Sequence, residues 1–360
     1  MSDLLQNLTD LLAIPGLSGH EDRVRRAIAA KLDALGITSH SDRLGNLIAT
    51  LPGDDPQVML FAHMDQLGFI LRKIEPDGFL RLERLGGVPE RALPAQEVVI
   101  STPDGRDIPG IIANKSHHAT KPDEKYTVLK TEELYVDCGF ASADEARAAG
   151  LNIGAPVVYA PGSFRIGEHR LTGPAIDDRA ACAVMIDLAA RLITRETGPT
   201  VHLVFSVQEE FNLRGAQVAA QTLLPDIAIQ LDLMLATDTP DMADRGEMRL
   251  GHGPGMSLYS FHGRGTLNGV LPHPALVKLI ETTAAQENIP LQRSAQTGIL
   301  TDLSYVQLVG EGVASIDLGF PMRYSHSARE VCDLRDLHAL TNLLDAALAR
   351  IKPDFNLNRD

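Results

Sequence analysis

Two hydrophobic patterns alternate along the chain. Apolar residues spaced three and four positions apart, the pattern of a helix with one buried face, run through residues 4–14, 21–36, 177–193 and 273–289. Nearly continuous apolar runs, typical of strands covered on both faces, occupy residues 56–65, 200–207 and 228–238. Strands that alternate with helices in this way predict an α/β fold with a mixed, mostly parallel sheet sandwiched by helices.

Between residues 69 and 164 the pattern changes to that of a small all-β module. Short strand-like runs separated by PDG and GAP turns occupy residues 68–74, 78–85, 97–102, 110–114 and 156–160. One helical stretch interrupts them at residues 142–150. We therefore predict an α/β domain made of residues 1–68 and 165–360, interrupted by an inserted β-rich domain at residues 69–164.

Composition and charge narrow the class of protein. Hydrophobic residues make up 44% of the 360 positions, enough for a sizeable core. The 33 basic and 47 acidic residues leave a net charge of −14, which argues against nucleic acid and anionic membranes as partners. Three scattered cysteines without a CxxC pair fit a reducing compartment, and neither a leader pattern nor an apolar run of roughly 20 residues is apparent. We expect a soluble, cytoplasmic protein.

Two adjacent carboxylates, Glu209 and Glu210, follow the predicted buried strand 200–207. Such a pair repels itself and loses solvation, so that something positive must compensate it. Arg214 offers a purely structural counter-charge, and a bound cation is the functional alternative.

Other acids and a histidine also stand at the ends of predicted elements. His63 and Asp65 lie two positions apart on the strand 56–65, so both project from one face. The carboxylate then orients either an ordinary core histidine or a metal ligand. Asp177 and Asp178 stand where a loop enters a helix, which they could simply cap. That place is also where α/β folds bind ligands.

Asp238 closes the apolar run 228–238, and His326 lies in a polar loop near the end of the chain. Each is unremarkable alone, but the whole set combines two imidazoles with several carboxylates, a choice of ligands suited to Zn²⁺, Co²⁺ or Mn²⁺. Because thiolates are missing from it, the set indicates a catalytic rather than a structural site. It suffices for two metals that share one carboxylate, with one glutamate left to act as general base on a metal-bound water.

The motifs AHMDQLGF, GPAIDDRAAC, VQEEFNLRGA, ATDTPD and RYSHSARE occur in an order and spacing that resemble the TET-type aminopeptidases, the family of glutamyl aminopeptidases and cellulase-like proteins. The resemblance extends over nearly the whole chain. It implies a di-zinc exopeptidase-like fold and two divalent metal ions per subunit, with Zn²⁺ first and Co²⁺ or Mn²⁺ as alternatives. It also implies peptide substrates with a free N-terminus, an insert that mediates dimerisation, and homo-oligomers that extend to a tetrahedral dodecamer.

Position within these motifs implies a role for each candidate residue. Asp177 would bridge the two metals, Glu209 would act as general base and acid, and Asp65 would orient a histidine. The other implied roles are His63 and Asp238 as ligands of one metal, Glu210 and His326 as ligands of the other, and Asp178 behind the ligands.

Other functions remain compatible with the same residues. A carboxypeptidase or a deacylase of N-acylated amino acids would need a cation to receive a substrate carboxylate, and Arg323 is available. A protein that kept the fold and lost turnover is a third reading, against which the retained ligands and base argue. A glycosidase needs only two opposed carboxylates and leaves the histidines unexplained. His117 and His118 either form a solvated loop or approach the site of a neighbouring subunit.

Overall fold

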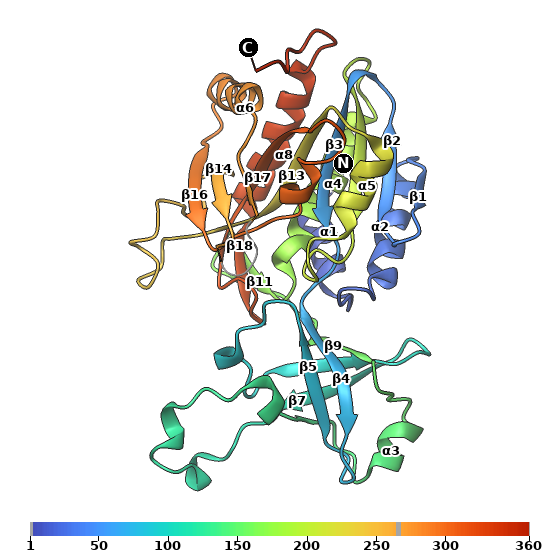
Figure 1. The fold of residues 1–360 in the computed structure, drawn as a ribbon, viewed down its shortest axis with the longest axis vertical. Helices are drawn as coiled ribbons and strands as arrows, with labels where there is room; N and C mark the ends of the chain where they lie inside the picture. Colours follow the sequence, from blue (N-terminus) through green and yellow to red (C-terminus); the bar gives the residue numbers. More distant parts are fainter. Residues whose placement is uncertain (1–2, 264–267, 360) are drawn as a thin grey trace.

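The computed structural model describes residues 3–263 and 268–359, which form a large α/β domain and a smaller β-barrel extending from one end of it (Figure 1). Within these residues the main sheet has 12 strands. Its path runs through β1 (Ser39–Ser41), β2 (Leu47–Leu51), β12 (Pro199–Ser206), β3 (Asp54–His63), β13 (Ile227–Leu235), β17 (Ala314–Arg323), β18 (Glu330–Asp333), β11 (Arg170–Gly173) and β10 (Phe164–Ile166). A branch from β17 adds β14 (Gly255–Phe261), β15 (Gly269–Val270) and β16 (Gln292–Thr297).

The four central strands β12, β3, β13 and β17 run parallel to one another, and most of their residues are buried. Alternate residues of these strands serve two cores: Leu203 and Phe205 pack on one face of the sheet, and Val204 packs on the other. This is the two-sided burial that continuous apolar runs predict.

Helices cover both faces of the sheet. One face packs against α1 (Leu4–Leu12), α2 (Asp22–Ala34), α4 (Ile176–Leu192), α6 (Pro274–Gln286) and α8 (Leu334–Arg350). The other face packs against α5 (Gly215–Leu223) and α7 (Leu303–Val306). The prediction of a mixed, mostly parallel sheet between helices is therefore confirmed. None of the helices in the described ranges is both long and apolar enough to cross a membrane.

The insert is a closed six-stranded barrel with its own core around Phe69, Val98 and Val157. Its strands are β4 (Gly68–Ile74), β5 (Leu80–Leu85), β8 (Val136–Asp137), β7 (Asp107–Ile112), β6 (Glu97–Ser101) and β9 (Pro156–Tyr159). Short helices decorate it: α3 (Ala143–Ala148), η1 (Glu90–Ala92), η2 (His117–Ala119), η3 (Glu124–Tyr126) and η4 (Thr131–Glu133). The β-rich character of the insert is confirmed. Phe164, which we placed last in the insert, begins β10 of the main sheet.

Candidate metal centre

The carboxyl ends of the parallel strands bring the candidate residues to one edge of the sheet. His63 is the last residue of β3 and is level with Ser206, the last residue of β12. Glu209 and Glu210 follow Ser206 after a short turn, and Asp177 lies in the first turn of α4, which packs on β3. This edge is where α/β folds place their ligands.

The carboxylate of Asp177 lies between the two histidines. Its Oδ1 is 3.0 Å from Nε2 of His63, and its Oδ2 is 3.6 Å from Nε2 of His326. The backbone N–H of Asp177 donates to the carboxylate of Glu330 at 3.0 Å, which helps to fix this turn. Each oxygen of one carboxylate thus faces a different imidazole, as a carboxylate shared by two cations must.

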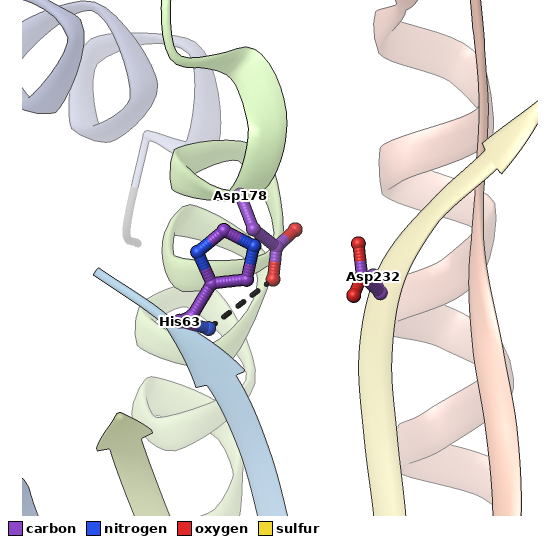
Figure 2. Close-up of side chains that lie close together, drawn as sticks. All are labelled: His63, Asp178 and Asp232. Atoms are coloured by element: carbon purple, nitrogen blue, oxygen red, sulfur yellow. Dashed lines mark hydrogen bonds between the residues drawn. The ribbon is translucent and has the colours of Figure 1, made fainter. Parts of the chain in front are cut away.

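Potential ligand atoms gather in two groups, and within each group they all lie within 4.8 Å of one another. The first group consists of Asp177, Glu210 and His326, and the second consists of His63, Asp178 and Asp232. Figure 2 shows the second group, in which the side chain of Asp232 on β13 faces His63 at the end of β3 and Asp178 at the start of α4. The peptide bond between Asp177 and Asp178 is cis.

The structure does not bring Asp238 into either group, although we predicted it as a ligand. β13 ends at Leu235, and the chain beyond it turns away to β17, where Arg323 donates to both oxygens of Asp238 at 2.7 Å. The N–H of Leu250 donates to the same carboxylate at 3.1 Å. Although burial opposes ionisation, the bonds from Arg323 hold the pKa of Asp238 below its ordinary value. Asp238 is therefore a salt-bridge partner of Arg323. Asp232 lies in the second group, where we had expected Asp238.

Asp232 carried a signal that our sequence reasoning passed over. It is a carboxylate in the middle of a buried strand, between Leu231 and Leu233, and only 7% of it is exposed. A charge at such a position is costly unless a cation lies beside it. We took the acid at the end of the apolar run because ligands tend to follow strands, whereas the acid that interrupts the run is the one at the site.

Burial makes Asp178, Glu210 and Asp232 difficult to ionise in the protein alone, because it raises the pKa of each. It raises the pKa of Glu210 and that of Asp232 to about 7, with the charge of Asp177 acting in the same direction. Oδ1 of Asp178 and Oε1 of Glu210 are buried and accept no hydrogen bond from the described residues. Unsatisfied carboxylate oxygens converging in this way fit divalent cations, which would hold the acids ionised.

Asp65 holds three members of the site in place. Its Oδ1 accepts the N–H of Glu209 at 3.1 Å, and its Oδ2 accepts the N–H of Glu210 at 3.0 Å and the hydroxyl of Ser18 at 2.5 Å. Its Oδ1 also lies 3.4 Å from Nδ1 of His63. Burial opposes ionisation of Asp65, but the bond to His63 keeps its pKa below the ordinary value. Asp65 therefore anchors both glutamates, and its backbone carbonyl oxygen lies 3.2 Å from Nδ1 of His63; that its carboxylate orients the imidazole stays a prediction.

A cleft of about 570 Å³ opens over the two groups. Glu209 lines it with Oε2 3.9 Å from Nε2 of His63, and burial raises the pKa of Glu209 well above its ordinary value. The barrel contributes Gly87 and Pro89 to the wall, and Nδ1 of His326 donates to the carbonyl oxygen of Gly87 at 3.0 Å. Burial lowers the pKa of His326, but Glu210 and Asp177 outweigh it and raise the value to about 9.

Two further predictions concern residues outside these groups. Arg323, which a deacylase would need for a substrate carboxylate, is engaged by Asp238. His117 and His118 lie in η2 of the barrel and are exposed. Their approach to a neighbouring subunit stays a prediction.

Several known proteins are similar to this chain in sequence and structure. Residues 45–343 match the family model of the M42 glutamyl aminopeptidases. The lysyl aminopeptidase of Pyrococcus furiosus is 33% identical over 352 residues, which are 96% of this chain and 97% of that protein. The aminopeptidase APDkam598 of Desulfurococcus kamchatkensis has a similar structure, with a TM-score of 0.91 and 33% identity over 98% of this chain and 96% of that one.

A third similar protein is the TET1 peptidase of Pyrococcus horikoshii, which can assemble into a tetrahedron or a large octahedral shell. Its TM-score is 0.86, at 26% identity, over 97% of this chain and 100% of that one.

Proposed function

The chain belongs to the M42 glutamyl aminopeptidase family, and we propose that it is an aminopeptidase that binds two divalent metal ions and uses Glu209 as general base. Membership in the family and the likeness to known aminopeptidases identify the chain as a peptidase of the aminopeptidase type. The number of metals, their ligands and the role of Glu209 are the proposal.

The observation that carries the proposal is the position of Asp177 between His63 and His326. We assign Asp177 as the shared ligand. The other ligands would be His63 and Asp232 at one metal and Glu210 and His326 at the other. Oδ2 of Asp178 accepts the backbone N–H of His63 at 3.3 Å, so Asp178 would support the metal held by His63 and Asp232. Nitrogen and oxygen ligands favour Zn²⁺, with Co²⁺ or Mn²⁺ as alternatives.

When bound, two such cations would acidify a water molecule and polarise the scissile carbonyl group. Glu209 would accept the proton of the attacking water and then transfer it to the departing amine. Its carboxylate lies inside the cleft beside His63, and its raised pKa favours accepting a proton near neutral pH. Asp65 would keep Glu209 in place through its bond to the backbone N–H.

The acidic cleft also supports the choice of an aminopeptidase over a deacylase. The free α-ammonium group of a peptide would be attracted to the carboxylate of Glu209, which the proposal leaves free of metal. Because Arg323 is paired with Asp238, it does not offer the free cation that a carboxylate would need.

Assembly, location and substrate preference also belong to the proposal. We propose that the chain forms homo-oligomers in the cytoplasm, with the barrel mediating dimers that assemble further into a tetrahedral dodecamer. The assembly of the TET1 peptidase supports this. The family is described as glutamyl and one relative as lysyl, so kinship alone leaves the preferred N-terminal residue open.

The test is hydrolysis of a panel of aminoacyl-p-nitroanilides, with N-acetylated counterparts, by protein stripped of metal and then resupplied with Zn²⁺, Co²⁺ or Mn²⁺. We expect metal-dependent release from free-amine substrates only. Glu209→Gln should lower kcat by roughly 10²–10⁴-fold while metal content stays at the wild-type value. Glu196→Gln, at an exposed surface glutamate, is the control and should keep full activity. Cleavage of the acetylated substrates, or a fully active Glu209→Gln variant, would overturn the proposal.

A further inference from the structure

A second, smaller cavity opens directly beside the metal cleft. The two cavities share Asp232, Leu233, Ile299 and Thr301 in their walls, so that the small cavity begins where the second ligand group ends. Its volume is about 20 Å³, which corresponds to a single water molecule or a group of that size.

The walls of the small cavity combine apolar side chains, such as Leu233, Met234 and Leu318, with several polar ones. Three serines and a glutamine line it together with two acids: Ser257, Ser260, Ser294, Gln296, Asp232 and Asp317. The hydroxyl of Ser260 and Oε1 of Gln296 are buried without a hydrogen-bond partner among the described residues. Buried polar atoms are normally paired, so these two call for a partner of the size of a water molecule or of a ligand's polar group.

Asp317 is a buried acid without a counter-charge. It is 3% exposed, and in residues 3–263 and 268–359 its carboxylate accepts only the hydroxyl of Thr301, at 3.2 and 3.4 Å. None of the arginines or lysines of the described residues forms an ion pair with it. Burial, with the charge of Asp232 added, raises the pKa of Asp317 to about 8. A cationic group entering the cavity would remove this penalty by pairing with the carboxylate.

The register of the sheet places Asp317 directly below the metal ligands. Asp232 on β13 is paired with Gly319 on β17, and Asp317 lies two positions earlier on β17. Because side chains alternate along a strand, Asp317 points to the same face as Asp232, about 7 Å deeper. Gly319 has no side chain, and a Cβ there would be only 1.9 Å from the carbonyl oxygen of Asp232. The backbone of Asp232 and the side chain of Met234 fill the space that a side chain at Gly319 would take, so the cleft and Asp317 are linked through the wall residues that the two cavities share.

We propose that the small cavity binds the end of the side chain of the substrate's N-terminal residue, and that Asp317 pairs with a cation there, so that the enzyme prefers N-terminal lysine. The inference rests on the proposed aminopeptidase function. The four-carbon stem of lysine spans the distance from the metal ligands to Asp317 and would lie in the wider cleft. Its compact ammonium group matches the small cavity, with hydrogens for Asp317, Ser260 and Gln296, whereas the planar guanidinium of arginine is larger.

The experiment compares lysyl-p-nitroanilide with norleucyl-p-nitroanilide, which has a side chain of similar length without the charge. We expect the wild-type, metal-loaded enzyme to cleave the lysyl substrate with at least a 10²-fold higher kcat/KM, since a site built for a polar group rejects an analogue that lacks it. Asp317→Asn should lower kcat/KM for the lysyl substrate by roughly 10²-fold and change it for the norleucyl substrate by less than about 3-fold. Asp187→Asn is the matched control, because Asp187 is a buried acid on α4 some three turns from the metal ligands.

A second measurement does not depend on turnover or on the folding of the variant. Free lysine should raise the melting temperature of the metal-loaded wild-type protein at concentrations where norleucine does not. In Asp317→Asn this difference between the two amino acids should disappear.

Each other outcome has a distinct meaning. If the wild-type protein cleaves no aminoacyl substrate, the proposed function fails and the inference fails with it. If the wild-type protein cleaves norleucyl and lysyl substrates equally well, or if Asp317→Asn lowers both equally, the function stands and the assignment of Asp317 is wrong. Equal melting-temperature shifts with lysine and norleucine in the wild-type protein would also overturn it.

Discussion

Replacing Asp232 and Asp238 by asparagine, one at a time, should distinguish a metal ligand from a salt-bridge partner. The two residues lie six positions apart on the same segment, and the motif pattern favoured Asp238, whereas the geometry favours Asp232. Asparagine is nearly isosteric with aspartate, so each substitution removes a charge and little volume.

The Asp238→Asn variant should lose stability and keep its metals. Asp238 accepts two bonds from Arg323 at 2.7 Å, and the two side chains are only 14% and 17% exposed. Hydrogen bonds to charged groups contribute about 1.5–3 kcal/mol, and removing the acid leaves the guanidinium half-buried and unpaired. We therefore expect the free energy of unfolding to fall by about 2 kcal/mol and the melting temperature to fall by a few degrees.

The Asp232→Asn variant should behave in the opposite way. In the wild-type protein the N–H of Leu233 donates to the carboxylate of Asp232 at 2.6 Å, and the amide oxygen of the variant can still accept this bond. Without metal, the substitution removes a carboxylate that burial already disfavours, so the stability of the metal-free protein should not fall. With metal, it removes one ligand of the second group, and we expect one of the two equivalents to be lost on dialysis.

The assay is metal analysis after loading with Zn²⁺ and dialysis, combined with melting temperatures measured in a chelator. Wild-type protein and both variants are treated in parallel. Loss of metal from Asp238→Asn together with two retained equivalents in Asp232→Asn would refute the reasoning from geometry. It would mean that the segment after β13 rearranges around the metal and releases Arg323.

Three further predictions concern the support of the site. Asp65→Asn should lower metal affinity and kcat/KM by roughly 10–100-fold, the usual effect of losing a residue that orients a ligand, with kinetics and metal titration as the measurements. Gly87→Ala would place a Cβ 2.8 Å from Nδ1 of His326, and should release one metal equivalent without unfolding the protein, as seen by metal analysis and circular dichroism. Burial raises the pKa of Asp336 to about 7 from an ordinary value of 3.8, so its contribution to stability is full below pH 3.8 and is lost as the pH rises through 7. Urea unfolding should therefore show a steeper loss of stability between about pH 4 and pH 7 in the wild-type protein than in Asp336→Asn.

The sequence predicted the architecture well because burial leaves a strong periodic signal. Every residue of β12 is buried, and the matching run of apolar residues is nearly continuous in the sequence. The barrel was equally visible as a change to short strands with turns between them. Phe164 was assigned to the wrong part because β10 is a short exposed strand, and all three of its residues face solvent.

The site was predicted less completely, and the error at Asp238 has a physical reason. Whether a carboxylate faces a site depends on where the strand ends and on what its neighbours offer, and neither is visible in a motif. Arg323 lies 85 positions from Asp238 in the chain, so the ion pair between them becomes visible only in the three-dimensional structure. The same holds for Asp317, which looks like an ordinary strand residue until the register with Gly319 and Asp232 is known.

The position of the barrel in the chain joins it to the metal centre. β3 ends at His63, and β4 of the barrel begins at Gly68, so only four residues separate a proposed ligand from the insert. On the opposite side of the site, the carbonyl oxygen of Gly87 receives the hydrogen of His326 Nδ1, which leaves Nε2 directed toward Asp177. The barrel therefore contributes to the orientation of an imidazole that it does not itself carry.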